Sequence, residues 1–375
     1  MRLPSPRFLI GLVLVLVACV TVAVLVTREG ESPPVAIDCI GGSEKTELIA
    51  DPDVARILRE RYGLTVNFLP MGSYDQVQLS KEELERRSVE CLWPASASAQ
   101  GVFEAKHTGA FVHYRAETVL QSPEVLYAGV SGVAALLATG LAQDRDGRLY
   151  LADVRTFLLD YVLKRRTWES IGAKDLRGPI AMASTDAAKS NSGFTLAQLQ
   201  LNVIATNEVY SAPSPAQAKA ALPAVRSLYD AQGLQARSSD FGFNQWLLQG
   251  GELHAPLYAG YENQIVQYLL KAGANRQALR DNVRVIYPEP TIYSDHPVLA
   301  LTADAARLID AMKDREIQIL AWERFGFRSG TEVGLNDVAA FPDVALAQQV
   351  RTTQPPSAEV TLMLLACVKD AAACT

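Results

Sequence analysis

The residues best suited to bind a ligand lie in the stretch 185–193, which reads Thr-Asp-Ala-Ala-Lys-Ser-Asn-Ser-Gly. An apolar strand-like run, 179–183, precedes it, and an amphipathic run that predicts a helix, 194–205, follows it. The first turn of a helix has backbone N–H groups without intrahelical partners and carries the positive end of the helix dipole. Small polar residues such as Ser190 and Ser192 can present those donors to an anion or a polar ligand. The stretch therefore predicts one wall of a binding pocket, and simple capping of the helix is the alternative.

Three earlier strand-like runs, 35–40, 64–69 and 89–93, also end in small polar residues. Helical patterns at 52–62 and 81–87 separate them, and this alternation predicts an α/β fold with a parallel sheet and right-handed crossovers. The loops that follow parallel strands lie at one edge of the sheet, where ligands bind in open α/β folds. The residues expected at that edge are Ser43, Lys45, Ser73, Ser96 and Ser98.

A second series of alternating elements follows. Helices are expected over 153–166, 215–229, 244–248 and 262–272, and strands over 179–183 and 254–259. The loop after the last of these strands adds Tyr261 and Glu262 to the candidate site. Beyond a strand at 283–287, an extended segment with three prolines, 288–297, predicts a crossing back to the first series. A strand at 298–301 and helices at 303–313 and 315–324 are expected after it.

Motifs for catalysis are absent from the sequence. The four histidines show no helical i, i+4 spacing typical of a zinc pair. No Gly-x-Ser-x-Gly, phosphate-loop or Gly-x-Gly-x-x-Gly pattern occurs. Asp186 and Glu262 could together bind a cation, but two carboxylates provide few of the oxygen ligands that such an ion needs. We therefore expect neither an enzyme nor a cofactor.

Charge and length narrow the function classes further. The chain has 375 residues, enough for two domains with full cores. Its formal net charge is −6, and no basic stripe stands out, which argues against nucleic acid as a partner.

The N-terminus predicts export. Residues 8–26 carry no charge, follow Arg2 and Arg7, and approach the length that spans a bilayer, so the expected form is a single-pass membrane anchor with the body outside the cytoplasm. The sequence Leu-Val-Ala-Cys ending at Cys19 leaves a lipoprotein as an alternative, and a cleavable signal is a third option.

Cysteines tend to pair outside the cytoplasm. Excluding Cys19, the cysteines are Cys39, Cys91, Cys367 and Cys374, which allow three connectivities. Because the first two lie in strand-like runs and the last two are close in sequence, we expect Cys39–Cys91 and Cys367–Cys374. Free buried thiols are the alternative.

Four segments together resemble the type 2 periplasmic solute-binding proteins, the extracytoplasmic receptors related to ABC importers. These segments are 42–45 (Gly-Ser-Glu-Lys), 122–126 (Ser-Pro-Glu-Val-Leu), Thr185-Asp186 with 190–193, and 318–328, which ends in Phe-Gly-Phe-Arg. The resemblance implies two discontinuous α/β lobes, joined by two hinge crossings, that close on a ligand. It places the first lobe at about 35–124 plus 290–375 and the second lobe at about 125–289, after the anchor and linker that the N-terminal sequence predicts at 1–34.

The combined site expected in the cleft is Ser43, Glu44, Lys45, Ser73, Ser96, Thr185, Ser190, Asn191, Ser192, Tyr261 and Glu262. This serine-rich set is similar to that of the family's oxyanion binders, although Glu44 and Glu262 would repel an anion if they pointed inward. Lys45 could hold a ligand charge or pair with Glu44 or Glu47. The permanent anchor expected at 8–26 departs from those oxyanion binders. With that anchor, the resemblance implies a membrane-anchored receptor that traps a small polar or anionic solute, with an ABC permease as a possible partner. The alternative is a sensor or interaction module of the cell envelope with the same fold and no role in transport.

Overall fold

The computed structural model describes residues 33–206, 211–233 and 235–375. The expected anchor at 8–26 and Cys19 lie outside these ranges. No helix within them is both long enough and apolar enough to span a membrane.

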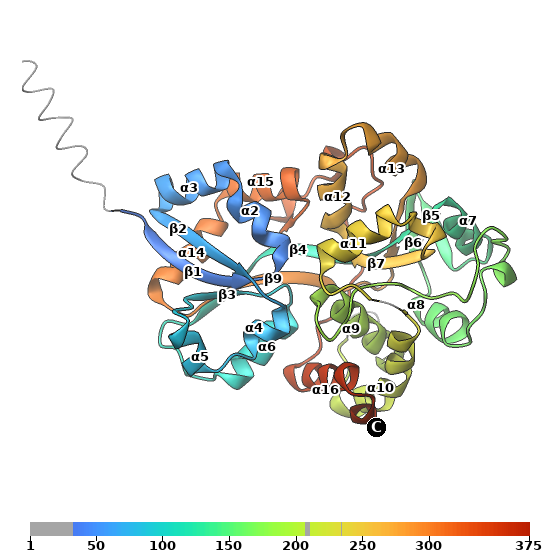
Figure 1. Ribbon diagram of the computed structural model, residues 1–375, viewed down its shortest axis with the longest axis horizontal. Coiled ribbons are helices and arrows are strands. Elements are labelled where there is room, and N and C mark those ends of the chain that lie inside the picture. Colours follow the sequence, from blue (N-terminus) through green and yellow to red (C-terminus); the bar gives the residue numbers. More distant parts are fainter. Residues whose placement is uncertain (1–32, 207–210, 234) are drawn as a thin grey trace, which may run out of the picture.

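The described chain alternates strands and helices (Figure 1). The strands are β1 Val35–Gly41, β2 Leu64–Pro70, β3 Cys91–Trp93, β4 Arg115–Ala128, β5 Ala142–Arg145, β6 Arg148–Leu151, β7 Leu257–Tyr261, β8 Arg284–Pro288, β9 Tyr293–Ala300 and β10 Arg328–Ser329. The helices of the first half are α2 Thr46–Ala50, α3 Pro52–Tyr62, α4 Ser73–Val77, α5 Lys81–Arg86, α6 Ala97–Lys106, α7 Val130–Ala138, α8 Val154–Thr156 and α9 Asn191–Thr206. Those of the second half are α10 Pro215–Asp230, α11 Ser239–Leu248, α12 Glu262–Lys271, α13 Arg276–Asn282, α14 Ala303–Met312, α15 Arg315–Phe325 and α16 Ala358–Lys369.

Local sequence explains many of these elements. In α3, the Asp51 side chain accepts hydrogen bonds from the N–H groups of Asp53 and Val54, Pro52 occupies the first turn, and Gly63 ends the helix with a φ of 60°. A capping aspartate and a proline at the start, with a glycine at the end, are the sequence signals that favour a helix between these residues. The predicted helix at 52–62 is therefore confirmed.

The strands form two sheets that correspond to two lobes. In the first lobe, β1 pairs in parallel with β2 and β3, as expected, while β9 runs antiparallel to β3. In the second lobe, β7 and β8 pair antiparallel with the last residues of β4, and β6 pairs in parallel with β8. Each sheet is covered by helices, which makes the fold α/β (Figure 1).

Two chain crossings join the lobes. The strand β4 pairs with β9 over residues 115–123 and then with β7 over residues 124–128, so it belongs to both sheets. The second crossing runs from β8 to β9 through residues 289–292 and contains a cis Glu289–Pro290 peptide bond. The expected lobe boundaries at 124/125 and 289/290 fall at these crossings, and the detailed division of the chain stays a prediction.

Two expected elements differ from the structure. The strand predicted at 179–183 is wrong, because this segment forms only isolated bridges, at Pro179 and at Ala183. Proline has no N–H to donate to a strand ladder, which removes one of the hydrogen bonds that would extend the pairing. The helix predicted at 153–166 is present in another form, since α8 continues into a π-helix at Phe157–Val162.

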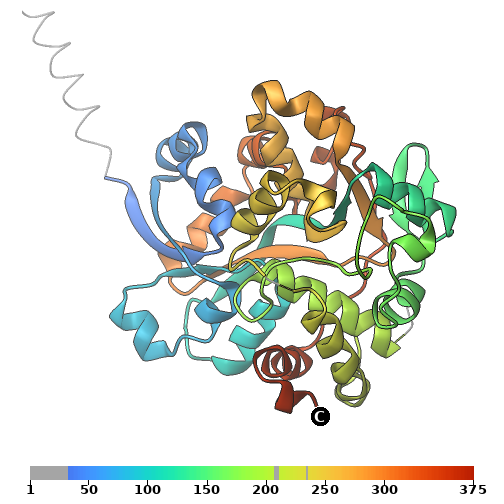
Figure 2. The same ribbon diagram turned by 45° about the vertical axis from the view of Figure 1, so that its right-hand side comes forward.

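A continuous apolar cluster connects the two lobes. Tyr74 of α4 packs on Phe194 of α9, with ring centroids 4.4 Å apart. The C-terminal helix α16 joins the same cluster, since its buried Leu364 packs there with residues of both lobes. This helix contacts α6 of the first lobe and α10 of the second, and it lies between them at the bottom of both views (Figure 2).

Both expected disulfides are confirmed. Cys39 and Cys91 are register partners on β1 and β3 and form one bond, and Cys367 in α16 bonds to Cys374 just beyond that helix.

Candidate ligand-binding site

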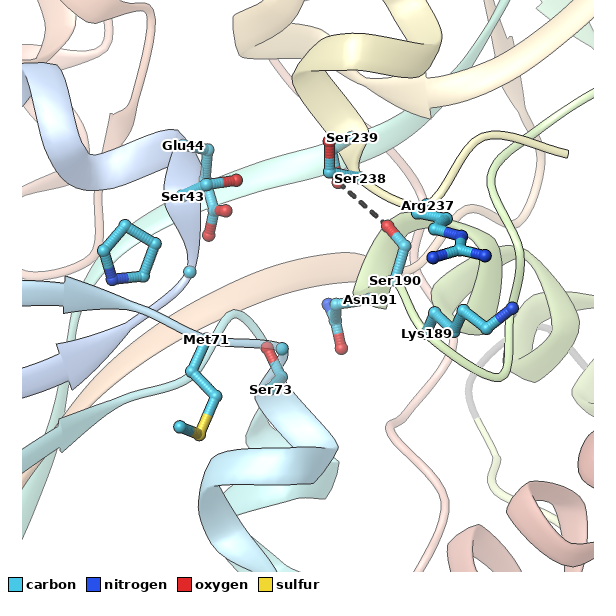
Figure 3. Close-up of a pocket in the computed structure, with 13 residues that line it drawn as sticks. Ser43, Glu44, Met71, Ser73, Lys189, Ser190, Asn191, Arg237, Ser238 and Ser239 are labelled. Atoms are coloured by element: carbon cyan, nitrogen blue, oxygen red, sulfur yellow. Dashed lines mark hydrogen bonds between the residues drawn. The ribbon is translucent and has the colours of Figure 1, made fainter.

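A cavity of about 220 Å³ lies between the two lobes. From the first lobe it is lined by Gly42, Ser43, Glu44, Pro70, Met71, Gly72 and Ser73. From the second lobe it is lined by Lys189, Ser190, Asn191, Arg237, Ser238 and Ser239. These residues come from four separate loops that converge on one space (Figure 3).

Each of the four loops leads into a helical turn. Ser43 begins a short 3₁₀ turn, Ser73 begins α4, Asn191 begins α9 and Ser239 begins α11. The first N–H groups of a helix have no intrahelical partner, and the helix dipole makes this end positive. The positive ends of the two longer helices, α9 and α11, therefore border the cavity on its second-lobe side.

The loop 185–193 is held in shape by its own polar groups. Thr185 Oγ1 accepts a hydrogen bond of 2.8 Å from the N–H of Gly193. A side chain on Gly193 would not fit, because a Cβ there would lie 2.0 Å from the Thr185 carbonyl oxygen. Asp186 supports the turn as well, because its Oδ1 accepts from the Ala188 N–H. Thr185 and Asp186 thus shape the loop behind the cavity rather than line it.

Three serine hydroxyls form a cluster at the second-lobe wall. Ser190 Oγ and Ser239 Oγ, which line the cavity, are 3.3 Å apart (Figure 3). Ser192 Oγ lies beneath them, 3.1 Å from Ser239 Oγ and 2.7 Å from Thr185 Oγ1, and Ser192 is fully buried. A hydroxyl both donates and accepts, so this cluster can reorient to serve either kind of ligand group.

Asn191 connects the cavity to the hinge and to the first lobe. Its Nδ2 donates to the Ala95 carbonyl oxygen at 2.6 Å and lies 2.7 Å from the hydroxyl oxygen of Tyr261. Tyr261 is therefore a support of the site, since its hydroxyl helps to hold the Asn191 amide in place.

Lys45 is buried behind the first-lobe wall. Its Nζ donates to Glu44 Oε1 at 2.6 Å and lies 3.1 Å from His296 Nδ1. Burial lowers the pKa of Lys45, and the neighbouring Glu44 opposes this effect. Burial and the charge of Lys45 lower the pKa of His296, so the imidazole is neutral. The salt bridge to Glu44, one of the two roles considered for Lys45, is the one found.

Glu262 also has a partner outside the cavity. Its carboxylate accepts two hydrogen bonds from the Arg328 guanidinium, at 2.7 and 2.8 Å, and one from the Tyr287 hydroxyl. This ion pair is buried and links α12 of the second lobe to β10, which pairs with β4. Glu262 is not among the residues that line the cavity, and its charge is balanced by Arg328, so the repulsion expected of an inward-pointing Glu262 does not arise.

The predicted residues thus separate into two groups. Those that line the cavity are Ser43, Glu44, Ser73, Ser190 and Asn191. Those that lie behind it are Lys45, Ser96, Thr185, Ser192, Tyr261 and Glu262. Ser96 caps α6, because its hydroxyl accepts from the Ser98 and Ala99 N–H groups.

Sequence reasoning missed the loop before α11. Arg237, Ser238 and Ser239 line the cavity, but the helix was expected to start at residue 244. The pair of serines followed by Asp240 is typical of a helix start and was the available signal.

The charges of the cavity are divided between its two sides. Glu44 lies on one side, and Lys189 and Arg237 lie on the other (Figure 3). Lys189 is half-exposed and pairs with Asp186 at 2.9 Å, while Arg237 is exposed and forms no ion pair with the described residues. The positive charges of Lys189 and Arg237 therefore add to those of the helix N-termini on the second-lobe side of the cavity.

A smaller cavity of about 120 Å³ adjoins the first and shares Ser43 and Glu44 with it. Asp240 and Glu47 also line it, from opposite lobes. Burial raises the pKa of Asp240 to about 6, and the nearby Glu44 and Glu47 carboxylates add to this shift. Within the described residues, no cluster of His, Cys, Asp and Glu side chains could hold a metal ion, so the structure gives no support to a cation site at Asp186 and Glu262.

Neither a protein-family model nor a curated protein matches the sequence. Solved structures match the fold along most of the chain. A periplasmic thiamin binding protein is similar with a TM-score of 0.59 at 10% identity, over 91% of this chain and 96% of that one. The periplasmic binding protein AfuA from Actinobacillus pleuropneumoniae, with exogenous fructose-6-phosphate bound, has a TM-score of 0.55 at 12% identity, over 90% and 98%. The sulfate-binding protein SubI from Mycobacterium tuberculosis H37Rv has a TM-score of 0.52 at 12% identity, over 87% and 96%.

These similarities show the fold. The chain has the two-lobed α/β fold of the type 2 periplasmic binding proteins, which confirms the fold class and the resemblance expected from the sequence. The three proteins named above are binding proteins that differ in the solute named for each.

Proposed function

We propose that this chain is an extracytoplasmic solute-binding protein that traps a small polar or anionic solute between its two lobes and delivers it to an ABC-type permease. The observation that carries the proposal is the cavity between the lobes, where four loops present helix N-termini and hydroxyl groups. Such an arrangement suits an anion or a polar ligand because its donors are already in place. The proposal includes no catalytic step, no cofactor and no nucleic acid.

The location outside the cytoplasm follows from the two disulfides, which persist in oxidising compartments. The proposed attachment to the membrane is the uncharged run 8–26, as an uncleaved single-pass helix with the body outside. A lipid on Cys19 is the alternative mode of attachment.

A second function is favoured by one observation. The apolar cluster that includes Tyr74 and Phe194 contains residues of both lobes beside the cavity. A protein whose lobes are held together in this way could act as a sensor or interaction module of the envelope, without a free solute and without a role in transport.

A thermal-shift experiment separates the two functions. A solute that binds only the folded state increases the free energy of unfolding and so raises the melting temperature. At a solute concentration one hundred times the dissociation constant, the gain in free energy is about 2.7 kcal/mol. We therefore expect at least one compound to raise the melting temperature in a panel of inorganic phosphate, sulfate, molybdate, amino acids, sugars and small carboxylates. If none does, the sensor or interaction function is supported and solute binding is contradicted.

The position of the site is tested by Ser190→Trp. The indole would fill the cavity, so the thermal shift should be lost while the circular dichroism spectrum is kept. Ser192 is less suitable, because it is fully buried and a bulky side chain would disturb the fold. Ser227→Trp on the exposed face of α10 is the matched control and should keep the shift. A shift that survives in Ser190→Trp would place the site elsewhere.

A further inference from the structure

Two charged side chains at the cavities between the lobes have no partner of opposite charge. The larger and the smaller cavity adjoin at Ser43 and Glu44, which line both. Arg237 lines the larger cavity, and Asp240 lines the smaller one. Neither side chain forms an ion pair or a hydrogen bond with the described residues.

The other charged side chains that line the two cavities are paired. The pairs are Glu44 with Lys45, Glu47 with Lys271 and Lys189 with Asp186. Among the described residues, one negative and one positive charge therefore remain uncompensated around the two cavities. A ligand that balances both of them must itself carry a positive and a negative group.

The uncompensated Asp240 carboxylate is unfavourable in the free protein. The helix α11 contacts the turn 43–45 of the first lobe, which brings Asp240 close to Glu44 and Glu47. Burial and these two like charges raise the pKa of Asp240 to about 6. An ionised Asp240 therefore costs free energy at neutral pH, and a cation in the smaller cavity would recover it. A group that lowers the stability of the free protein in this way is typical of a binding site.

The walls of the smaller cavity also suit a cation. Glu44 is 6% exposed, and its Oε1 accepts from Lys45, while its Oε2 accepts no hydrogen bond from the described residues and keeps accessible surface. Phe243 and Tyr268 line the same cavity, and aromatic rings attract cations. No cluster of the described residues could hold a metal ion, so the cation that fits is an organic one, such as an ammonium group.

The larger cavity suits an anionic group on the side of α9. Arg237 lies beside Ser190, at the start of that helix (Figure 3). The helix α9 has 16 residues and no acidic residue in its first turn, so nothing in the helix offsets its positive end. The helix α11 differs, because Asp240 lies in its own first turn and opposes its dipole. The anionic end therefore belongs with α9 and Arg237, and the cationic end with Asp240.

We propose that the solute is a zwitterion whose ammonium group binds between Glu44 and Asp240 and whose anionic group binds at Arg237 and the first turn of α9. This inference rests on the proposed function and narrows it, because a solute with only negative charge would leave Asp240 without a partner. Glu44 comes from the first lobe and Asp240 from the second, so the ammonium group contacts both lobes.

A matched series of compounds tests the need for a positive group, by isothermal titration calorimetry on the full-length chain at pH 7.5. Glycine, β-alanine, 4-aminobutanoate and 5-aminopentanoate differ in the separation of their two charges. Acetate, propanoate, butanoate and pentanoate are the matched anions without the ammonium group. At least one amino acid should bind about tenfold more tightly than its matched anion, which corresponds to about 1.4 kcal/mol.

The outcomes separate this inference from the proposed function. If every amino acid binds no more tightly than its matched anion, the inference is overturned and solute binding stands. The same holds if only an inorganic anion or a sugar of the thermal-shift panel binds. If no compound of the series or of the panel binds, both the inference and the proposed function are contradicted.

The role of Asp240 is tested by Asp240→Asn, which removes an uncompensated charge and so should not impair folding. The affinity ratio between the tightest-binding amino acid and its matched anion should fall to about one. Asp304→Asn, at an exposed position of α14, is the matched control and should keep the wild-type ratio. An unchanged ratio in Asp240→Asn would show that the ammonium group does not bind at Asp240.

The pH dependence of binding gives a second readout of the same contact. The titratable groups near Asp240 are Glu44, Lys45, Glu47, Lys271 and Tyr258. Because the ammonium group binds the ionised carboxylate, affinity for the amino acid should fall as the pH is lowered from 7.5 to 5.5, through the Asp240 pKa of about 6. Asp240→Asn should lose most of this dependence. The same dependence in both proteins would assign it to another group and contradict the proposed contact.

Discussion

At the scale of single residues, the site contains two kinds of side chain. Some lie behind the cavity and are hydrogen-bonded to other protein groups, and others line the cavity, where a ligand can contact them. Ser43, Ser190 and Asn191 could be predicted from the sequence, because each follows directly on a strand-like run or precedes a helical one. The burial of Lys45 could not be predicted, since its partner His296 is 251 residues away in the chain. Long-range contacts of this kind depend on the packing of the whole fold.

Asp240 should make stability depend on pH. Its folded-state pKa of about 6 lies above the ordinary value of 3.8, so the folded chain holds this proton more tightly than the unfolded chain. Stability from this group is therefore greatest below pH 3.8 and is lost as the pH rises to about 6. Asp240→Asn should remove this loss and raise the free energy of unfolding at pH 7, on the order of 1–3 kcal/mol.

Urea denaturation at several values between pH 4 and pH 7 measures this effect. The wild type should lose stability relative to Asp240→Asn across this range. Asp304→Asn, at an exposed position of α14, controls for the change of a carboxylate to an amide. Parallel curves for the wild type and Asp240→Asn would show that the Asp240 carboxyl is not perturbed by folding.

At the scale of elements, predictions succeeded where the local sequence contains both a start and a stop signal. The helix α3 has Asp51 and Pro52 at its start and Gly63 at its end, and its predicted bounds are those of the structure. The strand expected at 179–183 is wrong because Pro179 has no N–H to donate to a strand ladder, and the segment forms only isolated bridges. The helix α16 was not expected, because its apolar residues pack against helices of both lobes that lie far from it in the chain.

The ion pair between Glu262 of α12 and Arg328 of β10 should stabilise the junction of these elements. Glu262→Gln leaves the buried guanidinium without its counter-charge, which should cost about 3–5 kcal/mol in the free energy of unfolding. Chemical denaturation measures the loss. Glu85→Gln, which removes one partner of an exposed pair with Lys81, should leave the denaturation midpoint nearly unchanged.

A double variant distinguishes pairing from simple loss of packing. Replacing Glu262 and Arg328 together with methionine removes both charges, so most of the lost stability should return. A double variant as unstable as Glu262→Gln would show that the pair is not the source of the stability.

At the scale of the whole molecule, the two lobes share one apolar cluster, and α16 is the segment that completes it. Leu364 of α16 is fully buried there, while Leu362 of the same helix is 44% exposed. Leu364→Asp should therefore lower stability by about 3–5 kcal/mol, by loss of apolar contacts and burial of a charge. It should also enlarge the radius of gyration in small-angle X-ray scattering as the lobes separate.

Leu362→Asp is the matched control on the same helix and should change neither quantity. A radius of gyration that stays the same in Leu364→Asp, despite lower stability, would mean that the two crossings alone fix the arrangement of the lobes.

The central claim is that a solute binds between the lobes and contacts both of them. Amide hydrogen exchange, measured with and without the compound of the thermal-shift panel that raises the melting temperature most, tests this claim most directly. Exchange should slow at 43–45 and 73–75 in the first lobe and at 190–192 and 239–241 in the second, because these segments begin the helical turns around the cavity. Protection that appears in only one lobe, or in neither, would contradict a binding site between them.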